Sequence, residues 1–231
     1  KPLEIYLLMG QSNMSGRGEV DDCDRVSHPR VFMMDAAGRF VPAVEPVHFD
    51  KPSMCGVGPG LAFAKAIAEA RPEANVGLVP CAVGGTPLSR WTKHADLYDQ
   101  ALTRAKEARR FGRLAGMLWH QGESDADEQT DAETYGERLA AMISNLRADL
   151  GDHDLPCVVG TLGEFLQEHG GYRHFDLVNR QLRTLGRKMN RVRCADADGL
   201  GHKGDRLHFD APAARELGRR YARQMLRLLE E

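Results

Sequence analysis

The stretch Ile5-Tyr6-Leu7-Leu8-Met9-Gly10-Gln11-Ser12-Asn13-Met14 decides the fold of this chain. Five consecutive apolar residues that end at a glycine are typical of a buried central β-strand. Because glycine lets the backbone turn sharply, Ser12 is expected just beyond the carboxyl end of that strand, where open α/β sheets bind their ligands. On this stretch alone, an exposed reactive serine and a simple helix N-cap are equally good interpretations of Ser12.

The rest of the chain alternates apolar runs with amphipathic segments. Further strands are predicted at residues 76–79, 114–119, 157–160 and 192–195, and residues 31–34 are a short strand candidate. Helices are predicted from residue 59 to 71, over 96–110, around 135–146, over 177–189 and around 217–228. This alternation favours a parallel sheet with helices on both faces. We therefore expect an α/β fold with one domain over residues 1–231, a three-layer α/β/α sandwich whose five-stranded parallel sheet has a flavodoxin-like order.

The composition excludes several classes of partner. The 231 residues include 31 basic and 33 acidic side chains, which gives a net charge of −2 without a basic block. This balance argues against a nucleic-acid or anionic-membrane partner, and no apolar run approaches the roughly 20 residues of a membrane span. No signal peptide is visible; we expect a secreted or periplasmic location rather than a cytoplasmic one.

Five cysteines without close pairs indicate neither a disulfide framework nor a zinc site. Cys81, Cys157 and Cys194 lie in or beside predicted strands and are expected to be small buried residues. Cys23 and Cys55 lie in loop-like sequence, where an oxidising compartment would allow them to pair.

Four polar or glycine-rich clusters follow predicted strands or lie near the end of the chain. They are Gly10–Asn13, Gly84–Thr86, His120–Asp125 and Asp205–Phe209. Because parallel strands end at the same edge of a sheet, we expect all four to converge there. Together they offer a nucleophile, a base, carboxylates to orient the base and amide donors for an oxyanion.

The same clusters resemble the conserved blocks of the SGNH hydrolase superfamily. The resemblance rests on the strings GQSNM at Gly10–Met14, GGT at Gly84–Thr86, WHQGESD at Trp119–Asp125 and DRLHF at Asp205–Phe209. It is strongest with the sialate O-acetylesterase-like branch, which includes the acetylxylan esterases of carbohydrate esterase family 6. One departure is that Gln121 or Glu123 stands in the region where the wider superfamily has an oxyanion-hole asparagine.

The resemblance implies a serine esterase that removes O-acetyl groups from an acetylated oligo- or polysaccharide through an acetyl-enzyme. It implies no metal and no cofactor. Acetylated xylan or another plant polysaccharide is the leading substrate, and acetylated sialic acid is the next.

Chemistry suggests a role for each candidate catalytic residue. Ser12 is the nucleophile, and its weak hydroxyl needs a base such as His208 to take its proton. Asp205, three residues before His208, would hold the other ring nitrogen, although Asp205 and His208 also fit the entry to a helix.

Glu123 remains an alternative that would orient His208 instead or hold Gln121 in place. The oxyanion hole is expected to consist of the N–H groups of Ser12 and Gly85 and the side-chain amide of Gln121.

Other residues of these clusters are candidates for substrate contacts. Asn13 and Thr86 are secondary candidates for the hole and the substrate site. Trp91 fits a sugar-stacking platform as well as ordinary packing. His120 is expected at the rim, where we favour an ordinary polar residue over a catalytic one.

Two rival hypotheses use the same clusters. A metal-dependent hydrolase would use ligands from a set consisting of His120, Glu123, Asp125, Asp205 and His208, although their spacing matches no known metal motif. A non-catalytic carbohydrate-binding module would have lost catalytic residues, and every triad and oxyanion candidate is present here.

Overall fold

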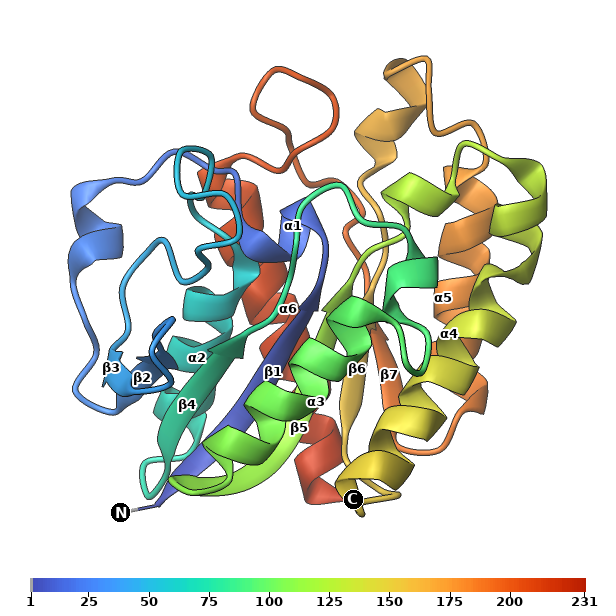
Figure 1. The fold of residues 1–231 in the computed structure, drawn as a ribbon. Helices are drawn as coiled ribbons and strands as arrows, with labels where there is room; N and C mark the ends of the chain where they lie inside the picture. The colour runs from blue at the N-terminus through green and yellow to red at the C-terminus, as the bar shows by residue number, and fades with distance from the viewer. Residues whose placement is uncertain (1) are drawn as a thin grey trace.

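A single seven-stranded sheet forms the centre of the computed structural model, which describes residues 2–231 (Figure 1). Its order is β3-β2-β4-β1-β5-β6-β7. The strands are β1 (Leu3–Gly10), β2 (Val31–Met34), β3 (Phe40–Pro42), β4 (Asn75–Pro80), β5 (Gly112–His120), β6 (Cys157–Gly160) and β7 (Val192–Ala195). All neighbours pair in parallel except β3, which runs antiparallel to β2.

The predicted α/β class is confirmed, but the predicted count of five strands was wrong. Strands β4-β1-β5-β6-β7 have the flavodoxin-like order, the second strand of this set lying outside the first. The sheet continues beyond them because β2 pairs with β4. Strand β3 then folds back on β2 in a stretch that was expected to be irregular, and it forms a short edge strand of the sheet.

Helices cover both faces of the sheet. They are α1 (Ser12–Ser15), α2 (Pro59–Ala70), α3 (Asp96–Ala108), α4 (Gln129–Leu150), α5 (Phe175–Lys188) and α6 (Ala211–Glu230). Helices α2 and α6 pack together on one face, and α3, α4 and α5 lie on the other (Figure 1). Short 3₁₀ turns are η1 (Asp22–Arg25), η2 (Leu88–Trp91), η3 (Glu123–Asp125) and η4 (Glu164–Glu168). Within the described residues, no helix is long and apolar enough to cross a membrane.

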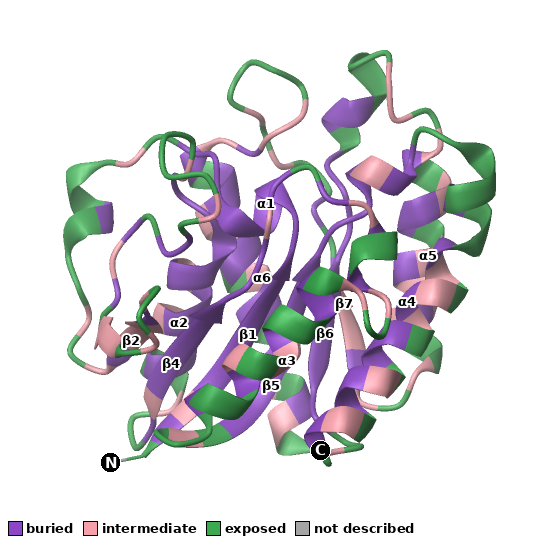
Figure 2. Cartoon of the chain, in the orientation of Figure 1, coloured by how far each residue is buried: buried purple, intermediate pink, exposed green. Residues whose placement is uncertain are grey.

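Strand β1 lies in the middle of the sheet, between β4 and β5, and most of it is buried (Figure 2). It ends at Gly10, whose φ of +131° is a conformation that favours glycine. A Cβ at this position would lie 2.0 Å from the carbonyl oxygen of His120 on β5. This close approach lets the N–H of Gln11 bond to that oxygen at 2.9 Å. The chain then turns directly into α1, which places Ser12 at the carboxyl edge of the sheet.

All five cysteines are free thiols. Cys81 and Cys157 are buried, as expected for small apolar residues, and Cys194 is half-buried. Cys23 and Cys55 do not pair with each other, so the disulfide considered from the sequence does not form in this structure.

Candidate active site

Ser12, His208 and Asp205 form a continuous chain of hydrogen bonds at the carboxyl edge of the sheet. The hydroxyl oxygen of Ser12 lies 3.1 Å from Nε2 of His208. Nδ1 of His208 lies 2.7 Å from Oδ2 of Asp205. Both distances suit hydrogen bonds, and the structure thus brings these three predicted residues into contact across almost the whole length of the chain.

The turn that contains Asp205 and His208 explains how a spacing of three residues suffices. The second carboxylate oxygen of Asp205, Oδ1, accepts the backbone N–H groups of Leu207 at 3.0 Å and His208 at 2.9 Å. These bonds fold the segment back so that the carboxylate reaches the imidazole. Asp210, not Asp205, caps α6, because it accepts the N–H of Ala213. The helix-entry interpretation of Asp205 is therefore wrong.

The environment keeps the imidazole of His208 neutral near pH 7. Burial lowers the pKa of His208 and outweighs the opposing effect of Asp205. Burial also acts to raise the pKa of Asp205, but hydrogen bonds from His208 and the N–H of Leu207 outweigh it, and the net shift is downward. A neutral imidazole can accept a proton from Ser12, and an ionised carboxylate can stabilise the imidazolium that results.

Glu123, the alternative partner of the base, lies elsewhere. Its side chain is buried, and Oε1 accepts the side-chain amide of Asn13 at 2.7 Å. In the part of the chain that the structure describes, Asp205 is the only carboxylate bonded to His208. Burial raises the pKa of Glu123 and so favours its neutral form.

Asn13 connects the segment that carries Ser12 to the segment that carries His208. Its Nδ2 donates both to Glu123 and to the carbonyl oxygen of Leu207, at 3.0 Å. Its Oδ1 accepts the N–H of Phe209 at 3.1 Å. Asn13 therefore holds both neighbours of His208. Its buried amide bonds within the protein, and the substrate contact expected for it stays a prediction.

Two backbone N–H groups of the predicted clusters have no hydrogen-bond acceptor among residues 2–231. Ser12 begins α1, and the first N–H groups of a helix have no partner within it. Among residues 2–231, no acceptor is bonded to the N–H of Ser12 or to that of Gly85. Gly85 has a φ of +76°, which favours glycine at this turn after β4. These groups fit the two backbone donors of the predicted oxyanion hole.

Gln121 was expected as a third donor, and the structure corrects this. The side chain is fully buried, and Nε2 donates to the carbonyl oxygen of Thr86 at 3.1 Å and to Oδ2 of Asp125 at 2.7 Å. The hydroxyl oxygen of Tyr135 lies 2.7 Å from the backbone carbonyl oxygen of Gln121 and 3.0 Å from its Oε1. Both amide hydrogens are therefore used, and Gln121 supports the Gly84–Thr86 loop instead of facing an oxyanion.

Thr86 and Trp91 are also buried rather than available to a sugar. The hydroxyl of Thr86 donates to the carbonyl oxygen of Val83 at 2.8 Å and accepts the indole N–H of Trp91 at 3.2 Å. The Trp91 ring is 1% exposed and packs edge-on against Trp119. Neither residue can contact substrate from this position, because packing around the indole leaves no free face for stacking.

His120 lies inside the protein rather than at the rim. It is fully buried, and Nδ1 is 3.0 Å from the hydroxyl of Tyr221 on α6. Burial lowers its pKa to about 3, which keeps the ring neutral. The predicted substrate contact is therefore wrong, and the view of His120 as an ordinary hydrogen-bonded residue agrees with the geometry.

The sequence did not reveal two polar residues of this region. Gln11 accepts the N–H groups of Gly122 and Ser124, at 3.5 and 3.3 Å, and so joins the first cluster to the third. Asp50, in the long loop after β3, forms a buried ion pair with Arg17 beside the Gly84–Thr86 loop. The only sequence signal for Asp50 is the length of its loop, since long ordered loops are commonly functional.

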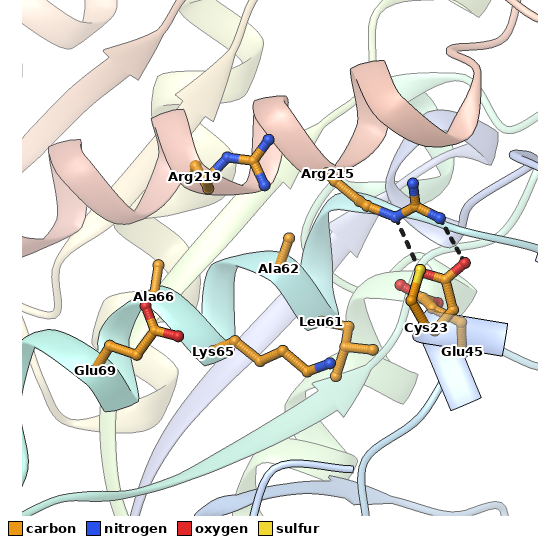
Figure 3. Close-up of a pocket in the computed structure, with 10 residues that line it drawn as sticks. Cys23, Glu45, Leu61, Ala62, Lys65, Ala66, Glu69, Arg215 and Arg219 are labelled. Atoms are coloured by element: carbon orange, nitrogen blue, oxygen red, sulfur yellow. Dashed lines mark hydrogen bonds and ion pairs between the residues drawn. The ribbon is translucent and has the colours of Figure 1, made fainter. Parts of the chain in front are cut away.

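The side chains of the metal hypothesis do not assemble into a ligand cluster. Within the described residues, the single group with suitable spacing is Asp21, Cys23 and Asp24 at η1. The guanidinium of Arg215 already lies 2.6 Å from Asp24 there. Arg215 and Cys23 line a cavity of about 290 Å³ between η1, α2 and α6 (Figure 3). None of the five residues of that hypothesis lines this cavity.

Comparisons with known proteins identify the family of this chain. The family described as "Carbohydrate esterase, sialic acid-specific acetylesterase" matches residues 2–227. The chain is 38% identical over 236 residues to an Arabidopsis thaliana protein named "Probable carbohydrate esterase At4g34215", with 94% of this chain and 88% of the relative covered.

Solved structures share the fold. The X-ray structure of the Arabidopsis thaliana protein matches with a TM-score of 0.88 and 36% identity, over 98% of this chain and 99% of the other. NanS matches with a TM-score of 0.79 and 18% identity, over 98% of both chains. A carbohydrate acetylesterase from Xanthomonas citri matches with a TM-score of 0.77 and 20% identity, over 98% of this chain and 56% of the other.

The family match covers nearly the whole chain, and it includes the segments that carry Ser12, Gly85, Asp205 and His208. The chain therefore belongs to the carbohydrate esterase family of sialic acid-specific acetylesterases, whose members are hydrolases of carboxylic esters.

Proposed function

We propose that this protein removes O-acetyl groups from a carbohydrate by a serine mechanism. The observation that carries the proposal is the hydrogen-bonded chain from Ser12 through His208 to Asp205, at 3.1 and 2.7 Å. The Ser12 hydroxyl attacks the acetyl carbonyl while Nε2 of His208 accepts its proton. Asp205 stabilises the imidazolium and keeps the ring oriented.

The tetrahedral intermediate places a negative charge on the former carbonyl oxygen. The N–H groups of Ser12 and Gly85 are suited to bind that oxyanion, because both lack an acceptor among residues 2–231. Collapse of the intermediate breaks the bond to the sugar oxygen, and His208 returns its proton to that leaving group. Water, activated by the same imidazole, then hydrolyses the acetyl-enzyme to acetate and regenerates Ser12.

The proposed substrate is an acetylated oligo- or polysaccharide, with acetylxylan first and acetylated sialic acid second. The family description supports sialate as a second candidate. We propose no cofactor, no nucleic-acid partner and no membrane partner, and a secreted or periplasmic location. Acetate release from a panel of acetylated xylo-oligosaccharides and acetylated sialic acids, with and without a chelator, tests substrate and metal independence together.

Ser12→Ala is the direct test of the mechanism. The variant is expected to lose acetate release from an aryl acetate almost entirely, because no other nucleophile replaces the hydroxyl, while its thermal midpoint stays close to that of the wild type. Ser144→Ala, an exposed serine on α4, is the matched control and should retain full activity. Activity of Ser12→Ala near the wild-type level would remove the serine mechanism.

A further inference from the structure

Asp50 receives four hydrogen bonds from three segments around the Ser12 site. Its Oδ1 accepts the hydroxyl of Ser15 at 2.6 Å and the thiol of Cys55 at 3.0 Å. Its Oδ2 accepts the backbone N–H of Gly84 at 2.8 Å and Nη2 of Arg17 at 3.2 Å. The carboxylate therefore joins α1 and the loop before α2 to the loop that contains Gly85.

Arg17 completes this connection from the other side. Its Nη1 donates to the Ser15 hydroxyl at 2.6 Å and to the carbonyl oxygen of Gly16 at 2.7 Å. Its own carbonyl oxygen accepts the ammonium of Lys203, which lies in the segment before Asp205. The side chains of Arg17 and Asp50 are only 2% and 3% exposed. Segments that carry the nucleophile, the base and Gly85 thus meet at one buried ion pair.

Gly84 is in direct contact with the Arg17–Asp50 ion pair. A Cβ on Gly84 would lie 2.4 Å from Nη2 of Arg17 and 3.3 Å from Oδ2 of Asp50. The bond from the Gly84 N–H to Asp50 sets the plane of the peptide before Gly84. Since the chain continues at once to Gly85, a shift of this anchor would move the Gly85 N–H relative to Ser12.

We propose that Asp50, with Arg17, is a positioning residue that holds the Gly85 N–H in place to bind the oxyanion. This inference rests on the proposed serine mechanism. Burial alone does not explain the pair, because replacing a buried ion pair by apolar residues is often neutral or stabilising for the fold. A pair that fixes a transition-state donor acts on kcat more than on KM, because the oxyanion exists only after attack.

Asp50→Ala and Asp50→Asn test the proposal. Loss of one oxyanion donor typically lowers turnover about 100-fold, and we expect a fall in kcat of this order for Asp50→Ala with little change in KM. Asp50→Asn keeps the shape and can still accept the Gly84 N–H, so its loss should be smaller. Active sites are counted by phosphonate labelling of Ser12, and Asp50→Asn decides the question if Asp50→Ala does not fold.

A sulfur substitution separates positioning from general damage. In an aryl thionoacetate, sulfur replaces the oxygen that becomes the oxyanion. Sulfur is a larger atom and a weaker hydrogen-bond acceptor, so backbone N–H groups positioned for an oxyanion stabilise it poorly. The wild type should therefore prefer the oxygen ester strongly, and both Asp50 variants should show a weaker preference. A purely structural role would lower both rates equally and leave the ratio unchanged.

Asp24→Asn is the matched control, because Asp24 also forms a partly buried ion pair, with Arg215. Within residues 2–231, its side chain has no bond to Ser12, Gly85 or His208. Its kcat and its oxygen-to-sulfur ratio should match those of the wild type. Asp50 variants that match Asp24→Asn in both quantities overturn the proposal. If Ser12→Ala is inactive in that case, the serine mechanism is still supported and only the proposed role of Asp50 is refuted.

Discussion

At the scale of single residues, the geometry assigns different tasks to two carboxyl groups. Asp205 contacts the imidazole of His208 directly, and this ring and two backbone N–H groups favour its ionised form. Glu123 is buried behind Asn13, and burial raises its pKa. A carboxyl group that favours its neutral form is a poor partner for an imidazolium but a sound acceptor for an amide hydrogen. Glu123 is therefore joined to the segment of His208 only through Asn13 in the part of the chain that the structure describes.

This division predicts unequal losses from two isosteric variants. Asp205→Asn should lower turnover on the order of 10⁴-fold, because the amide no longer stabilises the imidazolium or selects its tautomer. Glu123→Gln should cost far less, since Gln still accepts the hydrogen of Asn13. Turnover of both single variants and of the double variant measures the difference. A larger loss for Glu123→Gln would contradict the assignment of Asp205.

At the scale of elements, close packing of α2 against α6 sets the position of the segment that carries the base. Helix α6 begins two residues after Phe209, whose N–H is bonded to Asn13. A Cβ on Gly218 of α6 would lie 2.3 Å from the carbonyl oxygen of Pro59 and 2.9 Å from the N–H nitrogen of Phe63. Because both neighbours are backbone atoms of α2, they cannot move aside as a flexible side chain would.

Gly218→Ala should therefore destabilise the protein even though alanine favours helices. Overpacking of this kind costs about 1–3 kcal/mol, which lowers the melting temperature of a chain of this size by roughly 2–4 °C per kcal/mol. Gly136→Ala on α4 is the control, because the three atoms nearest to its Cβ, at 2.8 to 3.5 Å, belong to the side chain of Gln181 and not to backbone. Thermal melts of both variants give the comparison, and a Gly218→Ala protein as stable as the wild type would rule out tight packing here.

At the scale of the whole molecule, Glu45 couples the stability of the fold to pH. It lines the cavity between η1, α2 and α6 and is 3% exposed (Figure 3). Burial raises the pKa of Glu45 to about 8, although the hydrogen bond from the N–H of Val47 acts to lower it. Above the ordinary pKa of a Glu carboxyl, 4.5, the unfolded chain releases this proton and the folded chain keeps it up to about pH 8. The stability that this group contributes is therefore complete below the ordinary pKa and is lost as the pH rises through about 8.

Glu45→Gln should remove this dependence, because the neutral amide mimics the protonated carboxyl. The free energy of unfolding of the wild type should fall between pH 5 and pH 8, by about 1.4 kcal/mol for each unit of pKa shift, whereas the variant should show a flatter profile. Glu69→Gln, an exposed residue at the same cavity, is the control and should follow the wild type. Parallel profiles for wild type and Glu45→Gln would show that this carboxyl does not control the pH response.

The sequence by itself determined the alternation of strands and helices and the edge at which its polar clusters meet. Both follow from local periodicity and from the common direction of parallel strands. Contact among Ser12, His208 and Asp205 was predictable because each side chain lies directly after a strand or in a short turn. Tertiary structure alone decided the tasks of Asn13, Gln121, Trp91 and Asp50, and it added β3 to the sheet. Most of their partners lie far away in the sequence, and no local pattern encodes such contacts. Burial and long-range hydrogen bonds therefore decided which polar groups support the site from inside the protein.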